Sequence, residues 1–128
     1  MNRALIVVCS SVLLLSASTF AHHSFSATYD LKKTSSIEGK VVQFLMRNPH
    51  SFLHVAVKKD GQEQIWNVEW AAAGQLGGTV AGSLKAGDEV TVTGNPARDA
   101  ADMRLRMVSL RRISDGANWG FAAGQVVK

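Results

Sequence analysis

The sequence is poor in cysteine, proline and aromatic residues. Its 128 residues include one cysteine, two prolines and one tyrosine, and aromatic side chains make up 7% of the chain. A single cysteine, Cys9, excludes an intramolecular disulfide and a metal site built from several thiolates. The fold therefore cannot depend on a disulfide, and a metal would need ligands other than thiolates.

Recognisable catalytic arrangements are also missing. The sequence has no Ser-His-Asp context and no evident pair of carboxylates, and Cys9 lies in an apolar N-terminal segment rather than beside a histidine. Nucleophilic and acid–base enzymes depend on such arrangements. Their absence weighs against an enzyme.

No apolar run is long enough for a membrane span. The apolar segment at residues 4–15 is shorter than the roughly 20 residues that a spanning helix needs. It follows a positive charge at Arg3 and leads into small residues that end at Ala21, an order typical of a secretory signal. We expect residues 1–21 to be a signal peptide cleaved after Ala21. Residues 22–128 would then form one periplasmic domain without a membrane span.

The net charge of the chain is +4. Basic residues cluster late in the sequence, at Arg98, Arg104, Arg106, Arg111 and Arg112. A single-strand nucleic-acid surface would interleave such charges with aromatic rings, but here they alternate with aliphatic side chains. We predict that these arginines form the solvated face of a strand and expect no nucleic-acid partner.

Short β-branched and aromatic segments, separated by turn residues, dominate the rest of the sequence. The strands expected from this pattern are residues 37–46, 52–57, 65–70, 90–93 and 103–111. Asp60-Gly61 predicts a hairpin turn, and the alanine-rich residues 71–76 predict a short helix. Gly94-Asn95-Pro96 is expected to end the fourth strand. Residues 114–128 are left unassigned.

Three strands, a short helix and two more strands is the order of an OB-fold, a five-stranded Greek-key barrel. An immunoglobulin-like sandwich is the competing fold, but it would normally need about seven strands. We therefore predict an all-β protein with a small OB-fold-like barrel and a short helix between strands 3 and 4, after a cleaved signal peptide.

Five short motifs occur in a fixed order: Ala21-His22-His23-Ser24-Phe25, Asn48-Pro49-His50, Trp66-Asn67-Val68-Glu69, Leu84–Val90 and Gly94–Arg98. As an ordered set they resemble a family of short, exported proteobacterial proteins described as a domain of unknown function. The resemblance spans residues 22–112 and implies a periplasmic location and a small β-barrel. It implies no established reaction. Residues 71–76 depart from the family pattern, which has a helix with proline and leucine there.

The histidines are the candidate chemistry. Cleavage after Ala21 would make His22 and His23 the first two residues. A free α-amine and the imidazole of an N-terminal histidine can chelate one metal, and a third nitrogen completes a T-shaped site that suits Cu(II). His50 is the best distant partner, because it follows Asn48-Pro49 in a stiff turn. The predicted metal site is therefore His22, His23 and His50, with Cu(II) as the cofactor.

Two further residues could contribute to that site. His54 lies about 13 Å from His50 at strand spacing, so the two cannot share a metal without a bend between them. Glu69, on the outward face of the third strand, is either a carboxylate ligand or an acceptor for an imidazole N–H. An alternative is that the terminal histidines are solvated and that His50 only shapes a turn.

Three functions remain open at this level. The first is a small periplasmic protein that binds copper or a small ligand near His22, His23 and His50. The second is a non-catalytic envelope module that binds an oligosaccharide or a protein across strands 2 and 3, the usual OB-fold surface. The third is an oxidoreductase, because copper held by a terminal histidine can activate oxygen. Fold alone does not decide between them.

Overall fold

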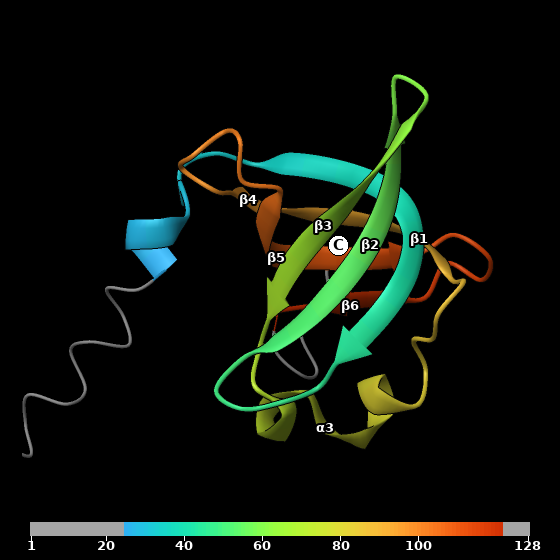
Figure 1. Cartoon of the computed structure of the whole chain (residues 1–128). Helices are drawn as coiled ribbons and strands as arrows, with labels where there is room; N and C mark the ends of the chain where they lie inside the picture. Colours follow the sequence, from blue (N-terminus) through green and yellow to red (C-terminus); the bar gives the residue numbers. More distant parts are fainter. Residues whose placement is uncertain (1–24, 122–128) are drawn as a thin grey trace, which may run out of the picture.

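The protein is a small β-barrel with one helix at its end. The computed structural model describes residues 25–121 (Figure 1). Its elements are β1 (Ser35–Leu45), β2 (Ser51–Lys59), β3 (Gln62–Trp70), α3 (Ala73–Ala81), β4 (Glu89–Pro96), β5 (Arg104–Arg112) and β6 (Asn118–Gly120). The predicted signal peptide, His22 and His23 lie outside the described residues.

The strands close into a barrel through one parallel pair. The sheet order is β3-β2-β1-β4-β5-β6, and its consecutive neighbours are antiparallel. β3 also pairs in parallel with β5, with Val68 opposite Leu105. This pairing joins the two ends of a five-stranded sheet, as in an OB-fold. The prediction of an OB-fold-like barrel is confirmed, and the alternative of an immunoglobulin-like sandwich is wrong.

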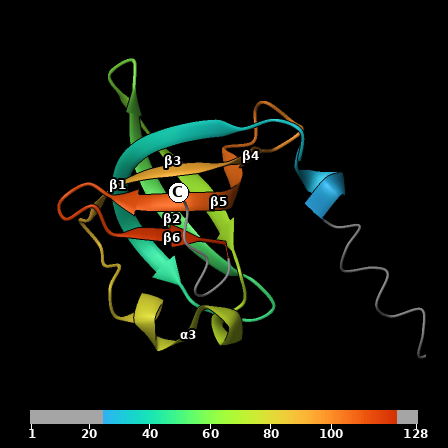
Figure 2. The ribbon, with the colours of Figure 1, turned by 180° about the vertical axis from the view of Figure 1, so that it is seen from behind.

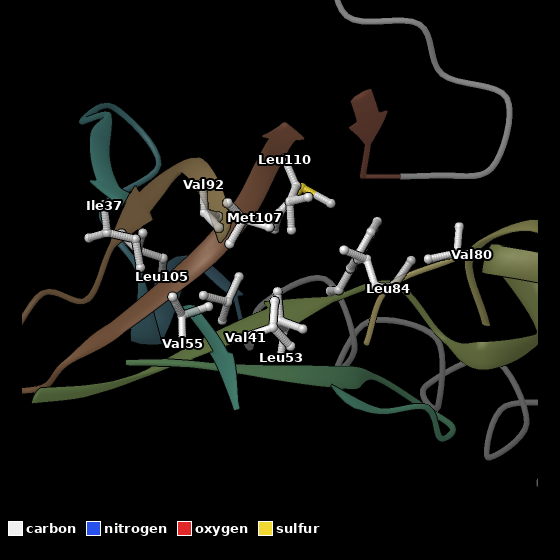
Figure 3. Close-up of a cluster of buried hydrophobic side chains, with 14 of the residues drawn as sticks. Ile37, Val41, Leu53, Val55, Val80, Leu84, Val92, Leu105, Met107 and Leu110 are labelled. Atoms are coloured by element: carbon white, nitrogen blue, oxygen red, sulfur yellow. The ribbon is translucent and has the colours of Figure 1, made fainter. Parts of the chain in front are cut away.

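Alternating side chains fill the barrel. Leu53 and Val55 of β2, Val68 of β3 and Leu105 of β5 are completely buried, and Figure 3 shows most of this cluster. β1 and β4 each place a glycine where a neighbouring strand passes closely. A Cβ at Gly94 would lie 2.3 Å from the Arg106 carbonyl oxygen. Glycine at this position therefore permits the strand spacing that closes the barrel.

The turn and helix follow their sequence signals with one difference. Asp60 and Gly61 have φ angles of 52° and 77°, as a two-residue hairpin turn requires. The helix expected at residues 71–76 lies at Ala73–Ala81 in the structure, and Gly77, with a non-helical φ of 65°, divides it at a kink. α3 covers one end of the barrel in both views (Figures 1 and 2), and its Leu76 and Val80 join the core.

The last third of the chain differs from the predicted boundaries. β4 does not end at residue 93 but runs through Gly94-Asn95-Pro96, because a register shift at Thr93/Gly94 lets pairing with β5 continue. β6, within the unassigned tail, pairs with residues 109–111 of β5. The Trp70 indole N–H donates to the carbonyl oxygens of Gly120 (3.2 Å) and Phe121 (2.9 Å). These two hydrogen bonds tie residues 120–121 to the end of β3.

Candidate functional site

Glu69 is a buried carboxylate on the outer surface of the barrel. Its register partners are Phe52 on β2 and Arg106 on β5, so all three side chains leave the sheet on the outer side. A carboxylate there would normally be solvated, yet Glu69 is only 7% exposed. The prediction that Glu69 points outward from β3 is correct. Its low exposure arises because residues 25–29 cover this position.

Residues 25–29 form this cover and are held by the end of β4. Residues 25–28 make one helical turn, which lies beside the connection between β4 and β5 (Figures 1 and 2). Tyr29 bridges to Ala97, and the backbone N–H of Arg98 donates to the Thr28 carbonyl oxygen at 2.9 Å. The Arg98 Nε–H donates to the Ser26 carbonyl oxygen at 2.7 Å. These bonds place Tyr29, which is completely buried, over Glu69.

Both oxygens of Glu69 have donors. The Tyr29 hydroxyl donates to Oε2 at 2.5 Å, and His50 Nδ1 lies 2.6 Å from Oε1. Arg104 Nη2 lies 3.6 Å from Oε2. Burial, followed by the hydrogen bond to Glu69, raises the pKa of Tyr29 well above its ordinary value, so the hydroxyl remains a donor. A buried carboxylate is stable only with such partners.

The turn before β2 places His50 beside this carboxylate. Its Asn48–Pro49 peptide bond is cis, and it is tied to the start of α3, where the Ala73 N–H donates to the Arg47 carbonyl oxygen at 3.0 Å. The His50 ring stacks on Phe25, with centroids 4.8 Å apart. The side chain of His50 is 29% exposed. With Nδ1 directed at Glu69, Nε2 is the nitrogen that can bind a ligand.

The structure joins two of the five predicted site residues. His50 and Glu69 are in contact, whereas no hydrogen bond or ion pair within residues 25–121 joins His54 to either of them. His54 pairs with Asn67 across β2 and β3, further along the barrel. His22 and His23 lie outside the described residues. Across residues 25–121, no group of three or more His, Cys, Asp or Glu side chains could hold a metal.

The prediction that the late arginines form a solvated face holds only in part: Arg98 and Arg111 are exposed, whereas Arg104, Arg106 and Arg112 are partly buried. Arg106 lies between two rings, 4.9 Å from the Phe25 centroid and 4.4 Å from the Phe121 centroid. Arg104 lies near Glu69, 5.7 Å from the Tyr29 ring centroid. The alternation on β5 does point them away from the core. Phe25, Tyr29 and Phe121 then pack over this part of the face.

Tyr29, Arg104 and Arg106 were not among the candidate residues predicted from the sequence. Their strands could be predicted, but their contacts depend on segments remote in sequence. Tyr29 is the single tyrosine and follows Phe25 by four residues, the spacing of one helical turn. That spacing is the one available signal that this segment packs as a unit.

A family model described as a family of unknown function (DUF6152) matches residues 9–106. The chain belongs to this family, which agrees with the resemblance found in its motifs. No curated protein matches the sequence. Within residues 25–121, no helix has the length and apolar character needed to cross a membrane.

Proposed function

We propose that this is a periplasmic copper-binding protein, exported and cleaved after Ala21. Cu(II) would be held by the α-amine and imidazole of His22 and by Nε2 of His50, with His23 as a further ligand. The observation that carries this proposal is the 2.6 Å contact between His50 Nδ1 and Glu69. A carboxylate partner on one ring nitrogen is the usual companion of a histidine that binds metal through the other.

The contact supports the proposal because it fixes the tautomer of His50. A neutral imidazole has one N–H, and a carboxylate acceptor at Nδ1 keeps that proton there. Nε2 then presents a lone pair at a partly exposed position. Copper would find the ring already oriented, with less conformational entropy to lose on binding.

Chain length permits the N-terminal histidines to reach His50. The Phe25 ring lies 4.8 Å from the His50 ring, and His22 precedes Phe25 by three residues. Three residues span at most about 10 Å. The start of a cleaved chain can therefore lie beside Nε2 without moving the barrel.

The proposal is tested with two forms of the protein, one that begins at His22 with a free α-amine and one in which that α-amine is acetylated. Copper titration of the first form should give a d–d absorption band at a stoichiometry of one. At a free copper concentration of 100 times Kd, binding should add about 2.7 kcal/mol to the free energy of unfolding. Acetylation should weaken binding, because it removes the α-amine from the chelate.

His50→Ala and His54→Ala are the matched pair of variants. Both remove one imidazole from the turn-and-β2 region, but only His50 contacts Glu69 and Phe25. We expect the His50 variant to lose the absorption band and the His54 variant to keep it. If both forms and both variants bind copper equally, the terminal chelate is wrong.

The interaction module remains the second candidate, because the outer face of β3 is open beyond the covered end. Ile65, two positions before Asn67 on the same outward row, is 49% exposed. An oligosaccharide or envelope protein could dock there. Binding of such a partner by metal-free protein, lost in Ile65→Lys and kept in His50→Ala, would favour this function over the first.

A further inference from the structure

We propose that the outer face of the β3–β5 pair binds a small hydroxylated carboxylate, such as a sugar acid. The helical turn at residues 25–28 covers part of this face and moves aside when the ligand enters. The site is built from residues of β3 and β5 and does not depend on copper, so it goes beyond the proposed function.

Polar atoms without hydrogen-bond partners gather on this face. Within residues 25–121, four buried side-chain nitrogen or oxygen atoms have no partner, and three of them belong to Asn67, Arg104 and Arg106. Asn67 is the register partner of Arg104 across the parallel pair. Arg106 follows two positions later on β5, on the same side of the strand. Because folded proteins pair the large majority of such atoms, three adjacent exceptions point to a ligand.

The unpaired atoms define the chemistry of that ligand. The Nε–H groups of Arg104 and Arg106 are donors. Together with a neighbouring Nη–H, each can hold a carboxylate through two parallel hydrogen bonds. The Oδ1 atom of Asn67 is an acceptor, which the hydroxyl of a ligand can satisfy. A small molecule that carries both a carboxylate and a hydroxyl therefore complements all three residues.

The charges on this face favour an anion. Three arginines and two carboxylates lie on it or beside it: Arg47, which stacks on Phe52, Arg104, Arg106, Glu69 and Asp102. The Nη atoms of Arg104 lie 3.6 Å from Glu69 and 3.8 Å from Asp102, which is longer than a charge-assisted hydrogen bond. A carboxylate ligand would therefore give Arg104 a stronger partner than either of these residues.

Aromatic rings occupy the place of that partner. The centroid of the Phe25 ring lies 4.9 Å from Arg106 Cζ, and that of Tyr29 lies 5.7 Å from Arg104 Cζ. A ring attracts a cation through its π face but offers its N–H groups no strong acceptor. Tyr29 is completely buried and would stay in place, whereas Phe25 is only partly buried and would turn away. Arg104 is already 32% exposed.

The experiment titrates metal-free protein with D-galacturonate and follows the arginine Nε–H and asparagine amide signals in nitrogen-15 spectra. The signals of Asn67, Arg104 and Arg106 should shift and saturate at a stoichiometry of one. D-galactose lacks the carboxylate and acetate lacks the hydroxyls, so each should bind at least about tenfold more weakly. Arg106→Gln, checked by circular dichroism for an intact barrel, should weaken galacturonate binding by at least about the same factor.

Arg98→Ala and Arg111→Ala separate the role of the cover from that of charge. Both remove one exposed arginine, but only Arg98 holds the cover, through the 2.7 Å bond from its Nε–H to the Ser26 carbonyl oxygen. A loosened cover raises the fraction of molecules with an open site, so Arg98→Ala should bind galacturonate at least about threefold more tightly than the parent. Arg111→Ala should bind it no more tightly than the parent.

The outcomes against the proposal are distinct. If neither the parent nor Arg98→Ala binds galacturonate, or if galactose or acetate binds equally well, the site is wrong. If Arg98→Ala binds no more tightly than Arg111→Ala, residues 25–28 do not limit access. None of these titrations contains copper, so failure of the copper site would leave their results unchanged.

Discussion

The close approach of β4 and β5 makes Gly94→Ala the most informative test of the barrel. An added Cβ would lie 2.3 Å from the Arg106 carbonyl oxygen and 3.0 Å from its carbonyl carbon. Both atoms belong to backbone, so the strands would have to separate by about 1 Å. Overpacking of this kind costs about 3 kcal/mol at the upper end of the usual range. For a domain of this size, that lowers Tm by at least about 10 °C.

Gly82→Ala is the matched control. It makes the same chemical change at the C-cap of α3, with nothing within 4 Å of the added Cβ and with a negative φ of −97° that alanine also adopts. The control should leave stability unchanged or raise it by up to about 1 kcal/mol. Thermal and urea unfolding of both variants would measure the difference. Equal midpoints for Gly94→Ala and Gly82→Ala would refute the argument from strand spacing.

Two further predictions concern the C-terminal part of the barrel. The Arg112 side chain, and next the Ala117 N–H, lower the pKa of Asp115 to about 2, so this pair stabilises the fold above about pH 4 and the effect is lost as pH falls towards 2. Asp115→Asn should therefore flatten the dependence of the urea midpoint on pH in that interval, and equal slopes would contradict this. Trp70→Phe removes the N–H that donates to the Gly120 and Phe121 carbonyl oxygens. The substitution should lower the free energy of unfolding by about 1–3 kcal/mol and speed amide exchange in β6. Unchanged exchange would show that these hydrogen bonds do not hold β6 in place.

The fold was largely predictable because its signals are local. Strict alternation at Val90–Thr93, the Asp60-Gly61 turn and the five-strand order depend on neighbouring residues. The misplaced end of β4 has a non-local cause: a bulge lets Gly94–Pro96 stay paired with β5. β6 was missed because three residues carry too little periodicity to be recognised.

The candidate site was predictable in part. The sequence identifies His50 through its turn and offers two roles for Glu69, ligand or acceptor. Only the three-dimensional structure shows that Tyr29 donates to Glu69, because the two residues lie 40 positions apart in the sequence. The same holds for Arg104 and Arg106: a strand pattern says which side chains point outward, and it cannot say that Phe25, Tyr29 and Phe121 pack over them. His22 and His23 stay a prediction.

The cover over Glu69 has a consequence for the order of assembly. Residues 25–29 are synthesised early, yet the groups that hold them, Ala97, Arg98, Arg106 and Phe121, come from the last third of the chain. Closing such a long loop carries an entropic cost that only a formed barrel can offset. A partly synthesised chain therefore lacks the contacts that hold residues 25–29 beside His50. The surroundings of that ring are completed last, when almost the whole polypeptide has been made.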